Sequence, residues 1–142
     1  MNLEQFKNLF DNCEIVGDKI VVTTNIRTVL DFIKETYHFE LLKDITAIDC
    51  CGLGIELRYR LFNIVDNEEL IVSYTVKDEA ESVSSVFDSA VADEKEIFDL
   101  FGIKFIGNEE LKRLYMPDSW VGYPLKKDYV ENDVRLNWND KT

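Results

Sequence analysis

Two neighbouring stretches of alternating side chains constrain the fold more than any other feature of this sequence. Residues 55–61 alternate apolar and charged side chains, and residues 70–77 show a second alternation after a polar loop at 66–67. Successive side chains of a β-strand point to opposite faces, so each stretch is predicted to be a strand with one buried face. With a further strand predicted from Leu41 to Cys51, they form an antiparallel meander.

The residues before the meander predict two helices and a hairpin. Residues 2–11 carry apolar side chains at spacings of three and four, which is typical of a short amphipathic helix. Two short apolar runs, 14–16 and 20–23, are joined by a Gly-Asp pair and predict a hairpin. Asn25 is a favourable N-cap for a following helix of about twelve residues.

The order of these elements predicts the fold class. Helix, two strands, helix and three strands correspond to an α+β two-layer sandwich with a mainly antiparallel sheet and helices on one face. The predicted globular domain covers residues 1–101 and includes a short acidic helix at 93–101. Residues 102–142 are predicted to form a long irregular C-terminal arm that packs on a partner subunit.

The composition excludes several classes of function. The 142-residue chain has a formal net charge of −12, whereas nucleic-acid binding needs a basic surface, so no nucleic-acid partner is expected. We expect a soluble intracellular protein without direct membrane insertion, because the sequence has no run of 18 apolar residues and no signal-peptide pattern. Its three cysteines are too few for a zinc or iron–sulfur site and are expected to be reduced thiols.

The acidic helix has a structural explanation. Asp93 and Glu96 are spaced as a capping box at a helix start, and Gly102 is placed to end the helix. Paired carboxylates also serve as general acids and bases or as metal ligands. No histidine follows Glu96 at the spacing of a carboxylate–histidine metal motif, and His38 is the single histidine of the chain.

The arm after Gly102 is long for a connection without regular structure. It holds both prolines, several large aromatic residues and two basic pairs, Lys112 with Arg113 and Lys126 with Lys127. Aromatic side chains interleaved with lysine and arginine are typical of a protein interface. The alternative is an arm that wraps its own domain.

Four motifs in this region resemble a known family. They are Glu94-Lys95-Glu96, Asp99-Leu100-Phe101-Gly102-Ile103, and the segments 107–113 and 117–129. They are similar to the E-R-E, D-x-F-G-I, G-H-P-D-L-R-R and D-D-W-x-G-H-P-L-R-K-D-Y motifs of the 30-kDa subunit family of respiratory complex I, known in bacteria as the C subunit of NADH dehydrogenase. The related subunit of energy-converting nickel–iron hydrogenases belongs to the same group. Departures from the motifs fall at Ala92, Lys95, Asn108 and Tyr123.

The resemblance implies a non-catalytic, cofactor-free subunit, scaffolding an oxidoreductase complex from the cytoplasmic, inner face of the cell membrane. It would pack beside the large subunit with the quinone or nickel site and the small cluster-bearing subunit; iron–sulfur clusters and quinone, or a Ni-Fe site, would lie on these partners. The implied partner interface comprises Lys112, Arg113, Trp120, Tyr123, Lys126, Lys127, Asp128 and Tyr129. The implied signature helix contributes Glu94, Lys95, Glu96 and Asp99.

Three alternatives remain open from the sequence. The parent complex is either a complex I-like NADH:quinone oxidoreductase or a membrane-bound hydrogenase. A stand-alone enzyme would use the carboxylates of residues 93–99 near His38, in a concave pocket with a raised carboxyl pKa. An independent acidic adaptor is the third possibility.

Overall fold

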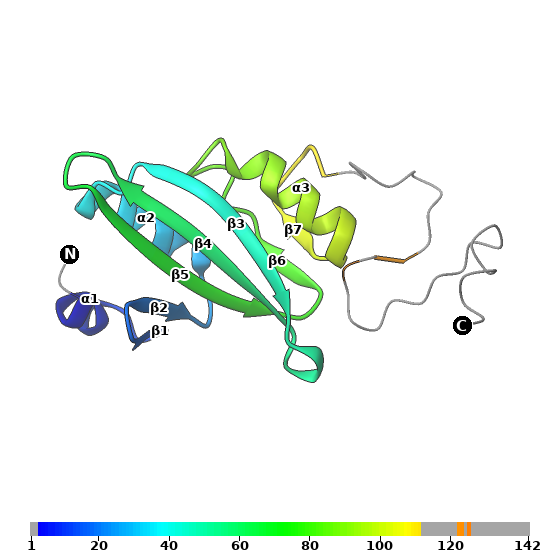
Figure 1. The fold of residues 1–142 in the computed structure, drawn as a ribbon, viewed down its shortest axis with the longest axis horizontal. Coiled ribbons are helices and arrows are strands. Elements are labelled where there is room, and N and C mark those ends of the chain that lie inside the picture. The colour runs from blue at the N-terminus through cyan, green and yellow to red at the C-terminus, as the bar shows by residue number, and fades with distance from the viewer. Residues whose placement is uncertain (1–2, 112–121, 124, 126–142) are drawn as a thin grey trace.

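A computed structural model describes residues 3–111, 122–123 and 125 (Figure 1). The helices and strands follow one another along the chain in the order α1 (Leu3–Leu9), β1 (Cys13–Val16), β2 (Lys19–Val22), α2 (Ile26–Tyr37), β3 (Leu41–Asp49), β4 (Ile55–Asn63), β5 (Glu68–Val76), β6 (Glu79–Glu81), α3 (Ala90–Phe101) and β7 (Lys104–Ile106). A short 3-10 turn, η1 (Cys51–Leu53), joins β3 to β4.

The main sheet has five strands in the order β1-β2-β5-β4-β3. The hairpin and the meander are antiparallel as predicted, and together with the helices they confirm the mainly antiparallel α+β fold. The hairpin joins the meander through a parallel pairing of β2 with β5, which the sequence did not predict. Alternation indicates which face of a strand is buried, but it does not identify the neighbouring strand.

The core lies between the sheet and α2, which runs behind the sheet in Figure 1. The apolar stripe of α2 is buried, and so are the alternating apolar residues of β4. The side chains at the alternate positions of β4 point to the opposite face of the sheet and are half-buried. The charged ones among them form ion pairs. Glu56 lies 3.3 Å from Lys19 and 2.9 Å from Arg58, and Arg60 lies 2.7 Å from Asp44.

The beginning of α2 is capped differently from the prediction. Asn25 occupies the N-cap position with a φ of 57°, but its side chain makes no capping hydrogen bond. The carboxylate of Glu81, in β6, instead accepts a hydrogen bond of 3.0 Å from the backbone N–H of Arg27. The Arg27 guanidinium also lies 3.7 Å from the Glu81 carboxylate. A residue 54 positions away therefore caps the helix.

The capping box predicted at Asp93 is wrong. Helix α3 begins at Ala90, so Asp93 lies within its first turn. The chain reaches this start through a tight turn in which the N–H groups of Val86 and Phe87 both donate to the carbonyl of Val83. Ser89 is the N-cap, but its hydroxyl donates to the Leu42 carbonyl at 3.3 Å instead of capping the helix.

The end of α3 agrees with the prediction. Gly102 has a φ of 80°, and its N–H donates to the Phe98 carbonyl at 3.0 Å. Residues 104–106, which fall within the predicted arm, form β7 and pair in parallel with β6. Most of the remaining arm lies outside the described residues, and the boundary between domain and arm stays a prediction.

Candidate functional site

The acidic side chains of α3 lie in very different surroundings. Glu94 and Asp99 are fully buried, Asp93 is half-buried and Glu96 is exposed. Lys95, the one basic residue of this helix, is half-buried. The two buried carboxylates need partners within the protein, because burying a carboxylate requires interactions that compensate for its lost hydration.

Glu94 accepts three hydrogen bonds from two separate segments of the chain. One carboxylate oxygen accepts hydrogen bonds from the Ser82 hydroxyl at 2.6 Å and the Asn108 amide at 3.0 Å. The other accepts one from the backbone N–H of Val83 at 2.9 Å. Burial raises the pKa of Glu94 and the nearby Asp93 charge acts in the same direction, whereas these three hydrogen bonds oppose the shift. Glu94 thus joins α3 to the chain before it and to the turn after β7.

Asn108 connects Glu94 to the turn that follows β7. Its side-chain oxygen accepts a hydrogen bond from the Glu110 backbone N–H at 3.0 Å, while its amide donates to Glu94. In the sequence, Asn108 stands where the family motif has a histidine. This departure was the feature that could have pointed to Asn108 as a residue of the site. Ser82 belongs to the segment 82–84, which precedes Ala90 at the family's spacing, but its contact with Glu94 depends on the fold.

Asp93 connects α3 to the edge of the main sheet. Its carboxylate accepts a hydrogen bond from the backbone of Ile45 in β3. This contact lies close to a register shift between Leu42 and Asp44. Burial raises the pKa of Asp93, and the charges of Asp44 and Glu96 raise it further. Helix α3 therefore lies along the outer edge of β3, as Figure 1 shows.

Part of the arm returns to the end of α3. The Tyr123 ring lies 6.3 Å from the Phe98 ring, measured between centroids, and the Leu125 N–H donates to the Leu100 carbonyl at 2.9 Å. This contact satisfies one of the carbonyls that a helix end leaves without an intrahelical partner. The structure thus places Tyr123 on its own domain.

Tyr123 is the single member of the predicted partner interface among the described residues. The other predicted interface residues lie outside them: Lys112, Arg113, Trp120, Lys126, Lys127, Asp128 and Tyr129. Their role in binding a partner stays a prediction.

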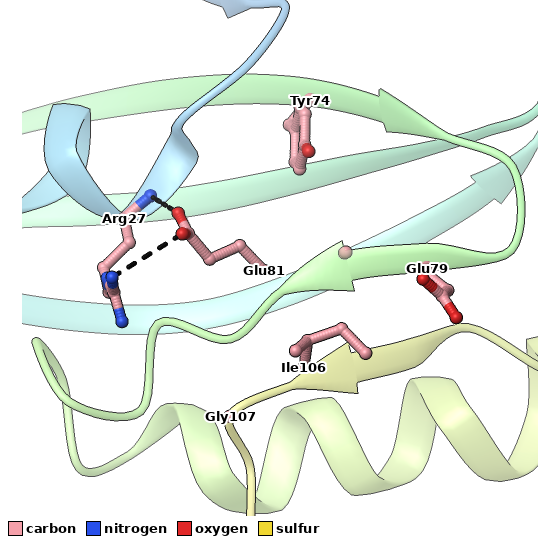
Figure 2. Close-up of a pocket in the computed structure, with 7 residues that line it drawn as sticks. Arg27, Tyr74, Glu79, Glu81, Ile106 and Gly107 are labelled. Atoms are coloured by element: carbon pink, nitrogen blue, oxygen red, sulfur yellow. Dashed lines mark hydrogen bonds and ion pairs between the residues drawn. The ribbon is translucent and has the colours of Figure 1, made fainter.

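A shallow pocket of about 430 Å³ lies where the start of α2 approaches β5 and β6 (Figure 2). Its lining residues are Arg27, Tyr74, Glu79, Ala80, Glu81, Ile106 and Gly107. The carboxylates of α3 do not line it, and neither does His38, which is exposed just after α2. The raised pKa that the enzyme hypothesis required occurs at Glu94, but this pocket does not join Glu94 to His38.

Within residues 3–111, 122–123 and 125, no cluster of histidine, cysteine or acidic side chains has the arrangement of a metal site. In the same residues, no helix is long and apolar enough to cross a bilayer. All three cysteines are free, and burial raises the pKa of the Cys13 thiol to about 11.

Comparison with known proteins gives one consistent family. Residues 20–134 match the family model for the respiratory-chain NADH dehydrogenase, 30 Kd subunit. The chain is 34% identical over 131 residues to the C subunit of the NADH-quinone oxidoreductase of Geobacter sulfurreducens, a match that covers 86% of this chain and 80% of that protein.

A longer relative contains the same region. The C/D subunit of the NADH-quinone oxidoreductase of Phocaeicola vulgatus is 36% identical over 110 residues, covering 73% of this chain but only 21% of that protein. The chain thus corresponds to about a fifth of this longer relative.

Among solved structures, the fold matches a chain in the membrane-bound sulfane sulfur reductase, an archaeal respiratory membrane complex. The TM-score is 0.80 at 26% identity, and the match covers 99% of this chain and 89% of that one.

Proposed function

Since this chain belongs to the 30 Kd subunit family of the respiratory-chain NADH dehydrogenase, we propose that it is a non-catalytic subunit of a membrane-associated NADH:quinone oxidoreductase. It binds the large quinone-site subunit and the small cluster-bearing subunit and holds these two subunits in a fixed position relative to each other. Iron–sulfur clusters and quinone are bound by these partners. The subunit lies at the cytoplasmic, inner face of the cell membrane.

The construction of α3 is the observation that carries the non-catalytic part of the proposal. Catalytic carboxylates must reach a substrate, whereas both oxygens of Glu94 accept hydrogen bonds from its own chain. Asp93 is likewise used to bind the edge of β3. The carboxylates of Glu94 and Asp93 hold α3 against neighbouring segments of the chain and so give the subunit a fixed shape. A scaffold subunit requires such a shape.

A second candidate is the equivalent subunit of a different membrane complex. The match to a chain of the sulfane sulfur reductase extends over nearly the whole of this chain. The four departures from the complex I motifs also favour a divergent branch, since lysine at position 95 lacks the bidentate geometry of arginine. The hydrogenase counterpart predicted from sequence belongs to this second class.

Purification of the tagged chain from its native cells tests the proposal. We expect it to elute with a large and a small partner subunit, and the complex to contain iron and to oxidise NADH with a quinone acceptor. An intact complex that reduces sulfane sulfur or protons instead would favour the second candidate. Recovery of the chain as a free monomer in mild detergent would overturn both.

A further inference from the structure

The turn between β4 and β5 exposes two adjacent apolar side chains. Val65 is 89% exposed and Ile64 is 71% exposed. Val65 is the most exposed large apolar side chain in the described part of the chain. Single exposed apolar residues are common on soluble proteins. Two consecutive ones at the tip of a long hairpin form a small apolar projection, here called the 64–65 tip.

Hydrogen bonds of the Asn63 side chain hold the turn in a fixed conformation. This side chain is only 2% exposed, and its oxygen accepts hydrogen bonds from the backbone N–H groups of Val65 at 3.0 Å and Asp66 at 3.2 Å. Its amide donates to the carbonyl of Tyr37 at 3.1 Å and to the Asp66 carboxylate at 3.1 Å. The turn is therefore fixed by polar bonds to which the side chains of Ile64 and Val65 do not contribute.

A rigid tip with β-branched side chains is well suited to binding. Isoleucine and valine have restricted χ1 angles, so they lose little conformational freedom when they are buried by a partner. A turn that only reversed the chain would be equally well made with polar residues at positions 64 and 65. The apolar pair thus has no evident use within its own domain.

The surroundings indicate the chemistry of the partner. Asp66 is exposed within the turn, and Glu69 is exposed at the start of β5. Lys43 is the nearby cation, but it is bound 3.2 Å from Glu69 and lies over the Phe62 ring. Because Glu69 is paired with Lys43, Asp66 leaves one net negative charge beside the tip, which disfavours an anionic lipid surface and favours a protein surface with lysine or arginine around an apolar pocket.

We propose that the 64–65 tip inserts into an apolar pocket with a basic rim on another protein subunit of the same complex. This inference rests on the proposed function as a scaffold subunit. In Figure 1 the tip projects from the end of the sheet away from α3. The tip and the arm that follows α3 would then give the subunit two separate attachment points.

The test compares two variants in the complex itself. Complex lacking this subunit is immobilised, and the purified chain is bound to it as wild type, as the double variant Ile64→Ser/Val65→Ser, or as Leu53→Ser. Leu53 is the matched control, because it is 79% exposed in η1. We expect the double variant to bind about tenfold or more weakly and the control to bind as wild type does.

The outcomes separate the inference from the function on which it rests. Wild-type binding that the double variant retains would overturn the inference and leave the proposed function intact. Failure of the wild-type chain to bind would overturn the proposed function. A double variant that binds the complex normally, but no longer binds phosphatidylglycerol vesicles or no longer dimerises, would assign the tip to a membrane or a second copy and overturn the inference. Unchanged circular dichroism excludes misfolding.

Discussion

The ring of Tyr123 lies directly over Gly102, the residue that ends α3. A Cβ atom at position 102 would lie 2.6 Å from a ring carbon of Tyr123, closer than side-chain atoms approach one another. The glycine also has a φ of 80°, a backbone conformation that L side chains rarely adopt. Two independent requirements therefore favour glycine here, and each makes a separate contribution to stability.

Gly102→Ala should destabilise the protein by about 1–3 kcal/mol, from the left-handed backbone and from displacement of the Tyr123 ring. Urea denaturation measures the loss. Gly52→Ala is the matched control, because a Cβ there meets no atom within 4 Å and φ is not positive. In a Tyr123→Ala background the loss should shrink to the backbone contribution. An equal loss in both backgrounds would contradict the contact.

Glu94→Gln should destabilise the protein by about 1–3 kcal/mol at neutral pH, because an amide cannot accept hydrogen bonds at both of its terminal atoms. Either the Ser82 and Asn108 donors or the Val83 N–H would lose their acceptor. Thermal and urea unfolding measure this change. Glu96→Gln, at an exposed position of the same helix, is the control and should change stability little.

The pH dependence of stability should differ between wild type and Glu94→Gln. The folded-state pKa of Glu94 is raised above its usual value of 4.5, so the folded protein binds the proton more tightly than the unfolded chain. The resulting stabilisation is fully present below pH 4.5 and is lost as the pH rises through the folded pKa. The free energy of unfolding of wild type relative to the variant should therefore fall over that window. A constant or rising difference would contradict the raised pKa.

Tyr59→Phe should leave stability within about 1 kcal/mol of wild type or increase it. Tyr59 is fully buried in β4, and its hydroxyl has no hydrogen-bond partner among the residues that the structure describes. Removing an unsatisfied buried hydroxyl removes a desolvation cost. Tyr59→Leu, which also removes ring volume, should be clearly destabilising under the same urea titration. A large loss for Tyr59→Phe would show that the hydroxyl is bonded.

Asn63→Ala should destabilise the β4–β5 turn by about 1–3 kcal/mol, because it removes the acceptor for two backbone N–H groups and the donor to Tyr37. Hydrogen exchange should accelerate at Val65 and Asp66. Asn67→Gly is the control, since residue 67 has a φ of 52° that glycine adopts without cost. Equal protection in Asn63→Ala and wild type would contradict the rigid turn.

The sequence predicted the parts of this fold that depend on local pattern. Alternation in residues 55–61 correctly indicated the buried face of β4, and Gly102 correctly marked the end of α3. The start of α3 was predicted wrongly because acidic residues suit the first turn of a helix wherever it begins. Here the turn at 83–89 determines the beginning, and its N-cap residue, Ser89, donates its hydroxyl to Leu42 instead of capping the helix.

The candidate site was only partly predictable, for a different reason. The motif identified Glu94 as important, but its burial depends on Ser82 and Asn108, which are 12 and 14 residues away in the chain. The capping of α2 by Glu81 spans 54 residues. Such contacts form only after the elements have packed, so one sequence without its fold cannot specify them.

The contacts of α3 with β3 also affect how readily the outer strand β3 can pair with strands of other molecules. An outer strand of a sheet normally offers its free N–H and C=O groups to strands of other molecules, which is a route to aggregation. Here Asp93 and Ser89 occupy such groups of Ile45 and Leu42. The other outer strand, β1, is only four residues long. Fewer backbone groups of these outer strands are therefore free to pair with a strand of another molecule.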